Sequence, residues 1–289
     1  MKILILGSMG NLGTQLVKIF SQDKNNKVIA WDRREIDITD KDLIFKKVEE
    51  LKPELIINSA AYNAVDKCED NEEEFEKALK INSEAVGYLA EAALESGAFL
   101  AHFSSDYVFD GEQKEGYDEN SKPNPINRYG ESKLGGEEEI IKRSGKGLKY
   151  YLIRVSKLFG PKPESAEAKP SFFDLILELS REKKDFKMVH EEEISCFTYT
   201  PDLAKKVKDL IDQDFGCGIY HITNSDPASW YEGAKYMFEV SGINDVNLSP
   251  CKMKDYPRPA KRPKYSVLKN TKLAPLRSWK EALKEYLKV

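Results

Sequence analysis

Short apolar runs alternate with longer amphipathic stretches over the first half of the chain. Apolar runs of this length predict buried strands, and the amphipathic stretches predict helices. The predicted strands cover residues 2–6, 27–31, 55–58, 99–104 and 150–155, and the predicted helices cover residues 12–21, 41–51, 72–96 and 129–143. Strands that alternate with helices favour a Rossmann-like α/β fold with a doubly wound parallel sheet.

The pattern changes after Gly160. A loop marked by prolines covers residues 161–170, and the segment 249–263 is rich in Pro, Lys and Arg. Further helices are predicted at 172–181, 203–211, 230–240 and 278–287, and a short strand at 218–222. We therefore predict a dinucleotide-binding domain of residues 1–154 plus about 190–224, and a smaller C-terminal substrate-binding lobe of about 155–189 plus 225–289. Such a lobe would cover the carboxyl ends of the strands, where ligands of these folds bind.

Composition excludes several classes of function. The 289 residues carry 45 basic and 49 acidic side chains, so no excess of positive charge indicates a nucleic-acid partner. No apolar run approaches the roughly 20 residues that span a membrane. The four cysteines lack the close spacing of a zinc site and predict reduced thiols in a cytoplasmic protein: Cys68, Cys196, Cys217 and Cys251.

A glycine loop follows the first predicted strand. Its spacing is Gly7-x-x-Gly10-x-x-Gly13, with Asn11 and Leu12 inside it. Glycines let the backbone approach a pyrophosphate, and the next helix directs free N–H groups toward the phosphates. The spacing differs from G-x-G-x-x-G, but its place between a strand and a helix predicts a dinucleotide site.

The second predicted strand ends in residues that could select the cofactor. A carboxylate at Asp32 would accept hydrogen bonds from the adenosine ribose, which favours NADH. Arg33 and Arg34 follow at once and would pair with a 2′-phosphate, which favours NADPH. The sequence leaves both cofactors open.

A tyrosine and a lysine lie four residues apart on the helix predicted at 129–143. Tyr129 and Lys133 would share one helical face, where an ammonium lowers the pKa of a phenol. The phenol can then give a proton to a carbonyl oxygen as hydride reaches its carbon. Ser105, after the strand predicted at 99–104, would bind the same oxygen. The same spacing recurs at Tyr231/Lys235 and Tyr265/Lys269, but only the first pair follows the fourth strand.

These features, with several longer runs, resemble the extended short-chain dehydrogenase/reductases, and most closely the dTDP-4-dehydrorhamnose reductase family. The resemblance covers nearly the whole chain. It depends on the runs at residues 57–69, 102–111, 127–137, 229–231 and 256–263, of which Ser104-Ser105-Asp106-Tyr107-Val108-Phe109-Asp110-Gly111 is the most specific.

The resemblance implies that NADPH or NADH reduces a nucleotide-linked 4-keto sugar, in the family's case dTDP-4-dehydrorhamnose to dTDP-L-rhamnose. It implies Tyr129 as proton donor, with Lys133 and Ser105 beside it. The cofactor wall would include Asp37, Ile38, Ala61, Tyr62 and Asn63. The substrate would meet Ser105, Asp106, the stretch around Lys157, and Arg262 near its diphosphate.

Two stretches on the substrate side depart from the family pattern. Lys157 stands where the family has a tryptophan over the sugar. The family's Q-x-G-[AS]-P-T run appears at residues 192–198 without its glycine and proline, which predicts a reshaped loop. The sequence therefore predicts that the reductase chemistry is retained, and it leaves the identity of the sugar open.

Other interpretations stay open at this point. An epimerase or dehydratase of the same superfamily is one, although dehydratases place an Asp-Glu pair where this chain has Asp106-Tyr107. A cofactor-binding regulatory or scaffold subunit is another. Some relatives bind Mg²⁺ through glutamates at a dimer interface, and Glu191-Glu192-Glu193 lies near that region; a solvated acidic turn without metal is the favoured interpretation. A homodimer is compatible with the resemblance.

Overall fold

The computed structural model describes residues 1–163 and 170–289. Residues 164–169, inside the loop predicted at 161–170, lie outside the described residues.

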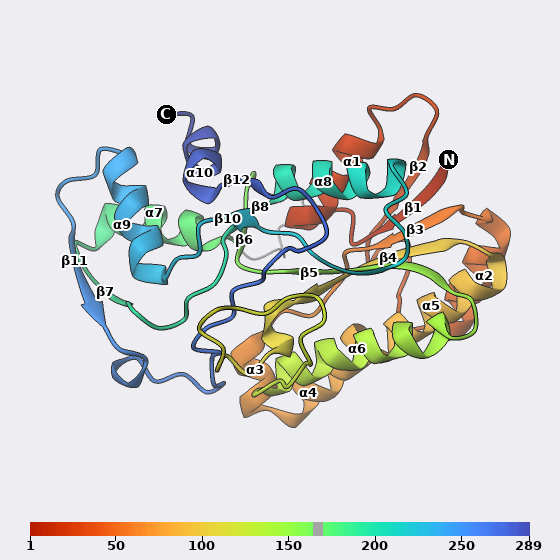
Figure 1. Cartoon of the computed structure of the whole chain (residues 1–289), viewed down its shortest axis with the longest axis horizontal. Helices are drawn as coiled ribbons and strands as arrows, with labels where there is room; N and C mark the ends of the chain where they lie inside the picture. Colours follow the sequence, from red (N-terminus) through yellow and green to blue (C-terminus); the bar gives the residue numbers. More distant parts are fainter. Residues whose placement is uncertain (164–169) are drawn as a thin grey trace.

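A parallel sheet of six strands forms the centre of the larger half (Figure 1). Its strand order is β2-β1-β3-β4-β5-β9, and it confirms the predicted doubly wound fold. The strands are β1 (Lys2–Leu6), β2 (Lys27–Trp31), β3 (Leu55–Asn58), β4 (Phe99–Ser105), β5 (Lys149–Val155) and β9 (Gly218–His221). Because β2 and β3 flank β1 on opposite sides, the order reverses at β1, which opens a ligand crevice at the carboxyl ends of these strands.

Helices cover both faces of the sheet. In Figure 1, α1 (Asn11–Phe20) and α8 (Thr200–Asp212) lie above it, whereas α2 (Lys41–Leu51), α5 (Ala85–Ser96) and α6 (Arg128–Ser144) lie below. Alternate strand residues face opposite sides. Ile3 and Ile5 of β1 therefore enter the core with α1 and α8, and Leu4 and Leu6 enter the core with α2 and α5.

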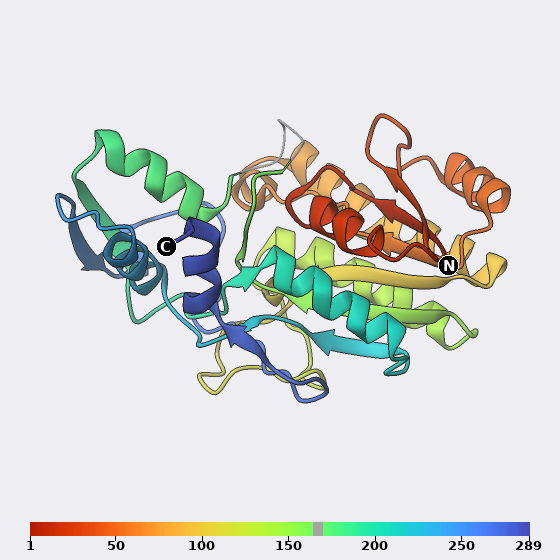
Figure 2. The ribbon, with the colours of Figure 1, turned by 90° about the horizontal axis from the view of Figure 1, so that it is seen from above.

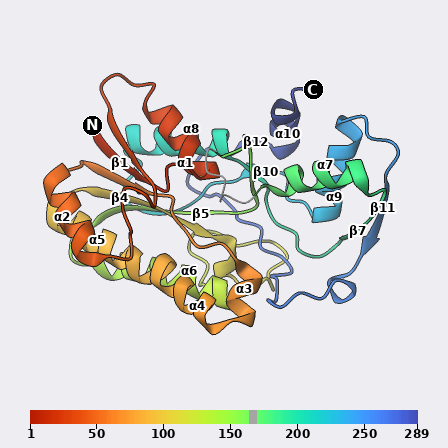
Figure 3. The same ribbon diagram turned by 180° about the vertical axis from the view of Figure 1, so that it is seen from behind.

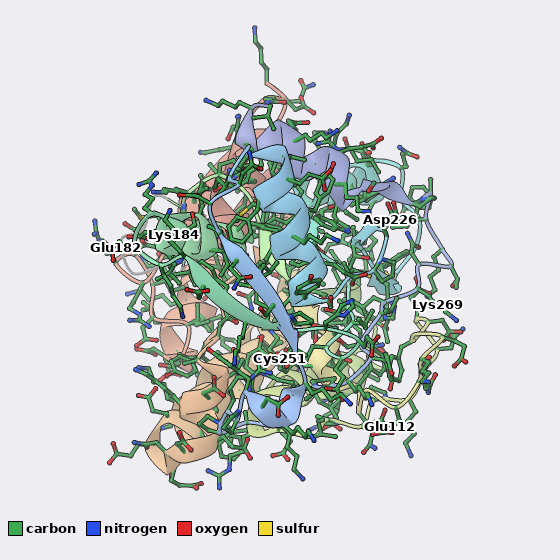
Figure 4. All side chains as sticks on the ribbon, turned by 90° about the vertical axis from the view of Figure 1, so that its left-hand side faces the viewer. Glu112, Glu182, Lys184, Asp226, Cys251 and Lys269 are labelled. Carbon is green, nitrogen blue, oxygen red and sulfur yellow. The ribbon has the colours of Figure 1, made fainter. Side chains whose placement is uncertain are left out.

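The second, smaller lobe lies at the carboxyl end of the sheet, at the opposite end of the molecule from the N-terminus (Figure 2). It contains α7 (Phe172–Glu182), α9 (Trp230–Val240), α10 (Trp279–Leu287) and the parallel pair β7 (Asp185–Val189) and β11 (Asn247–Cys251). Figure 4 looks onto this lobe, with Lys184 before β7 and Cys251 at the end of β11. Its core is aromatic, and Phe173, Phe197 and Trp279 pack there on one another.

Short elements join the lobe to the sheet. They are β6 (Leu158–Phe159) paired with β8 (Thr198–Tyr199), β10 (Asn224–Ser225) paired with β12 (Leu276–Ser278), and the 3₁₀ turns η2 (Asp106–Val108) and η3 (Met253–Asp255). None of these was predicted, because strands of two or three residues leave no periodic pattern. The first residues of the segment 249–263, which is rich in Pro, Lys and Arg, belong to β11.

The helix predicted at 72–96 is continuous but not uniform. It consists of α4 (Glu72–Leu79), a π-helical turn η1 (Lys80–Glu84) and α5, and it follows the short α3 (Val65–Asp70). Figure 3 shows α3 and α4 beside the start of α6. Turns of the π type often mark functional positions. Across the described ranges, no helix is long and apolar enough to cross a bilayer.

Candidate active site

Of the five residues predicted here, Gly7 and Gly10 lie in the loop between β1 and α1, and Asn11, Leu12 and Gly13 form the first turn of α1. Gly7 has a φ of +71°, which favours glycine. A Cβ on Gly13 would lie 2.0 Å from the carbonyl oxygen of Gly7, so only glycine allows the two backbones to approach so closely. The helix α1 begins at Asn11, and its first N–H groups and positive dipole end form the kind of site that binds phosphates.

A cavity of about 440 Å³ opens beside this loop at the ends of β1, β2 and β3. Six residues predicted for the cofactor line it: Gly7, Asp32, Asp37, Ile38, Ala61 and Tyr62. Arg33, which the sequence offered to a 2′-phosphate, lines it too, and so do two cations that were not predicted, Lys77 and Lys80. The cavity therefore offers both carboxylates and positive charges to an adenosine.

The two carboxylates predicted for the cofactor, those of Asp32 and Asp37, accept hydrogen bonds from residues two positions further along the chain. Asp32 accepts a hydrogen bond from the backbone N–H of Arg34 (2.8 Å). Asp37 accepts from the backbone N–H and the hydroxyl of Thr39 (2.9 and 2.7 Å). These hydrogen bonds from Thr39 are the main reason that the pKa of Asp37 is lowered. The carboxylates of Asp32 and Asp37 each hold a local turn, and so they help to fix the shape of the cavity wall.

Asn82, in the π-helical turn η1, was not predicted as a site residue. Its side-chain oxygen accepts from the backbone N–H of Tyr62 (2.8 Å), and its amide donates to the carbonyl oxygen of Tyr62 (2.9 Å) and to Ser132 (3.0 Å). Ser132 in turn donates to the carbonyl oxygen of Tyr129 (2.8 Å). One buried amide thus ties the cofactor wall to the first turn of α6. A polar residue inside an amphipathic helix gives no signal of such a role.

Tyr129 lies in the first turn of α6, which Asn127 caps by accepting from the N–H of Gly130 (2.8 Å). The tyrosine is only 8% exposed, and its hydroxyl donates to the side-chain oxygen of Asn63 (3.3 Å). Burial is the main cause that raises the pKa of Tyr129, and a hydrogen bond with Ser105 opposes it. The structure thus brings Tyr129, Asn63 and Ser105 together and keeps the phenol protonated at neutral pH.

Lys133 lies one turn farther along α6 and is buried. Its ammonium donates to the carbonyl oxygen of Phe103 (2.7 Å). Burial lowers the pKa of Lys133 to about 8, and the nearby Glu137 partly offsets this. The sequence led us to expect that this lysine would lower the pKa of Tyr129. Instead that pKa is raised, because the burial of the phenol, and then the charge of Asp106, outweigh the hydrogen bond with Ser105.

Asp106 follows Ser105 and is 3% exposed. Its carboxylate accepts from the hydroxyls of Ser105 (3.1 Å), Ser156 (2.8 Å) and Ser266 (2.6 Å). Burial raises its pKa, whereas these hydroxyls act in the opposite direction. The three donors bring together β4, the end of β5 and the C-terminal segment at one point.

Lys157 lies in a second, much smaller cavity with Asp106, Trp230, Arg262 and others. Its ammonium donates to the carbonyl oxygens of Glu193 (2.9 Å) and Ala228 (3.0 Å) and lies 4.2 Å from the ring centre of Trp230. Burial lowers the pKa of Lys157 to about 7. Trp230 belongs to the 229–231 run, but its place in this pocket was not predicted.

Arg262 also lines this pocket, and its guanidinium pairs with both carboxylate oxygens of Asp66 (2.9 and 2.8 Å).

The expectation of a solvated acidic turn at residues 191–193 is wrong for one of the three glutamates. Glu191 is exposed and Glu192 binds Lys264 (3.4 Å), but Glu193 is buried. Over residues 1–163 and 170–289, no group of three or more His, Cys, Asp or Glu side chains is arranged to hold a metal ion.

Comparison with known proteins agrees with this geometry. A model of the family described as RmlD substrate binding domain matches residues 1–289. A dTDP-4-dehydrorhamnose reductase from Aggregatibacter actinomycetemcomitans is 34% identical, over 98% of this chain and 97% of its own.

Two crystal structures are similar over nearly the whole chain. One is a dTDP-4-dehydrorhamnose reductase from Clostridium acetobutylicum, with 40% identity, a TM-score of 0.90 and coverage of 100% of this chain and 99% of its own. The other, from Bacillus anthracis, is in complex with NADP, with 32% identity, a TM-score of 0.90 and coverage of 99% and 98%.

A Rossmann-type parallel sheet, with a glycine loop after its first strand, defines the class of doubly wound α/β nucleotide-binding proteins. Within that class, the match over the full length shows that the chain belongs to the RmlD family of dTDP-4-dehydrorhamnose reductases.

Proposed function

We propose that the protein is an NAD(P)H-dependent reductase of a nucleotide-linked 4-keto sugar and converts dTDP-4-dehydrorhamnose to dTDP-L-rhamnose. The observation that carries this proposal is the buried hydroxyl of Tyr129, which lies beside Asn63 and Ser105. The names of the relatives support the choice of sugar and nucleotide.

The bound nicotinamide cofactor would supply hydride to the carbonyl carbon. The residues of this chain supply the proton and the position of the oxygen. Tyr129 donates its proton to the carbonyl oxygen, and Ser105 donates a hydrogen bond to the same oxygen. Because the pKa of Tyr129 is raised, the phenol holds its proton at neutral pH until charge develops on the oxygen.

Lys133 keeps most of its charge at neutral pH, because its pKa of about 8 lies above that range. A buried ammonium close to the reacting tyrosine stabilises the phenolate that remains after proton transfer. We assign it this role and the binding of the nicotinamide ribose, with Phe103 fixing its direction.

We infer NADPH as the preferred cofactor, with NADH as the alternative. One oxygen of Asp32 already accepts from the backbone of Arg34, whereas Arg33, Lys77 and Lys80 supply positive charge to the wall. A 2′-phosphate would gain from those charges. The structure of the relative in complex with NADP fits this inference.

A labelling experiment tests the proposal. The protein is incubated with dTDP-4-dehydro-6-deoxy-L-mannose and with NADPH or NADH that carries deuterium at the transferable position. The proposal predicts dTDP-L-rhamnose with deuterium at C4, detected by NMR, with faster turnover for NADPH. Bound cofactor without transfer to this sugar or to other 4-keto sugars would contradict it and favour a regulatory subunit.

A further inference from the structure

Two arginines of the proline-rich segment are each held by one carboxylate. Arg262 forms a forked pair with Asp66, which lies on α3 of the larger half. Arg258 forms an ion pair with Glu193, which lies on the loop before β8. The side chains of Arg262 and Arg258 are 9% and 21% exposed, so both charges are largely withdrawn from water.

The charges of the two guanidinium groups act on each other. Burial and then the charge of Arg262 lower the pKa of Arg258. Both arginines also act on Asp66, whose pKa is lowered by them although its own burial opposes this. Two like charges that are close and poorly hydrated require anions beside them. Here the anions come from two separate parts of the chain.

The pair lies next to the proposed reaction centre. Arg262 and Glu193 line the small cavity that also contains Asp106 and Lys157. The charges of both arginines act on the hydroxyl of Tyr107, whose ring packs edge-to-face on Tyr129 with 5.5 Å between ring centres. An anion bound between the arginines would therefore be held within one aromatic layer of the proton donor.

We propose that Arg258 is a second arginine for the diphosphate of the nucleotide sugar, and that Glu193 and Asp66 pair with the two guanidinium groups until the diphosphate displaces them. This inference rests on the proposed function. A guanidinium fork binds carboxylates and phosphates with the same paired hydrogen bonds, so one can replace the other without a new geometry. A diphosphate supplies two adjacent anions, which matches two adjacent arginines.

Glu193 connects this exchange to the sugar end of the pocket. Its other carboxylate oxygen accepts from the indole N–H of Trp230 (2.7 Å), and its carbonyl oxygen holds the ammonium of Lys157. Its φ is +54° and that of Lys157 is +39°, conformations that are strained for residues other than glycine. One residue thus contacts Arg258, the indole and the ammonium through three different oxygens.

Calorimetry of product binding tests the proposal. Binding of dTDP and of dTMP is measured with saturating NADP⁺, which fills the dinucleotide site and shows that each variant is folded. Arg258→Gln is expected to weaken dTDP binding about tenfold, and dTMP binding less than about twofold. Glu193→Gln is expected to tighten dTDP binding severalfold, because glutamine still accepts from Trp230 but no longer competes for Arg258.

Lys261→Gln is the matched control, since it removes an exposed charge from the same segment, and its affinity for dTDP should stay within about twofold of wild type. Unchanged dTDP binding in Arg258→Gln overturns the role of Arg258. Unchanged or weaker binding in Glu193→Gln overturns the role of Glu193 as competitor. The labelling experiment separates this from the proposed function: binding of dTDP that depends on Arg258, without any sugar reduction, would contradict only the latter.

Discussion

At the scale of single residues, buried charged side chains determine the chemistry of the small cavity that contains Asp106 and Lys157. Lys157 is the clearest case, because its ammonium is held by two carbonyl oxygens and two aromatic rings, those of Trp230 and Phe197. Its folded-state pKa of about 7 lies well below the ordinary value of 10.5. The sequence showed that Lys157 replaces the family's tryptophan. It did not show the partners of Lys157, because Glu193, Ala228 and Trp230 lie far along the chain.

Replacement of Lys157 by methionine should change the pH dependence of stability. Between about pH 7 and 10.5 the unfolded chain binds a proton at Lys157 that the folded chain does not. The free energy of unfolding of the wild type should therefore rise through this range relative to Lys157→Met. Urea denaturation at several pH values measures this difference. A parallel pH dependence in both proteins would contradict the buried ammonium, and Lys261→Met is the exposed control.

At the scale of elements, the glycine loop and the π-helical turn place the cofactor wall. Strand and helix types were predictable here, because β1, β3 and α1 carry strong apolar patterns and Asn127 caps α6. The π-helical turn was not predictable, because it changes hydrogen-bond register without changing the apolar pattern.

Alanine at the last glycine of the loop should prevent cofactor binding. A Cβ on Gly13 would lie 2.0 Å from the backbone oxygen of Gly7 and push the loop apart, whereas a Cβ on Gly10 would lie 3.4 Å from it. We expect Gly13→Ala to weaken NADPH binding at least about a hundredfold and Gly10→Ala to weaken it far less. Fluorescence titration of NADPH compares them. Equal effects would contradict the close approach of Gly13 and Gly7.

Removal of the Asn82 amide should affect both stability and the cofactor. Asn82→Ala leaves the backbone N–H and carbonyl oxygen of Tyr62 without their partner. Each unsatisfied group should lower the free energy of unfolding by about 1–3 kcal/mol. Because Tyr62 lines the cofactor cavity, NADPH binding should weaken as well. Asn71→Ala, which removes the cap of α4, should cost about 1 kcal/mol and leave NADPH binding unchanged. The same loss of affinity in both variants would contradict a specific role for Asn82.

At the scale of the whole molecule, ion pairs join separate elements, one pair between neighbouring elements and another across most of the chain. Arg154 of β5 pairs with Glu137 of α6 (2.6 Å), and both are almost fully buried. Arg262 and Asp66 are 196 positions apart. The sequence predicted the order of sheet and helices because these depend on local period. It did not predict these pairs or the β7–β11 pairing, because they depend on tertiary packing between remote segments.

Disruption of the Arg154–Glu137 pair should destabilise the molecule strongly. Arg154→Met leaves the carboxylate of Glu137 buried without its partner, which typically costs about 3–5 kcal/mol. Glu50→Gln removes an exposed partner of Lys47 and should cost at most about 1 kcal/mol. Chemical denaturation measures both. A loss for Arg154→Met as small as for Glu50→Gln would contradict the buried pair.

The most direct measurement is NADPH oxidation by wild type and Tyr129→Phe with dTDP-4-dehydro-6-deoxy-L-mannose, together with NADPH binding to both proteins. Loss of the proton donor should lower kcat by about a hundredfold or more. NADPH affinity should stay within a few-fold of wild type, because the ring still fills its buried place beside Tyr107. Turnover by Tyr129→Phe close to that of wild type would contradict the central role of this hydroxyl.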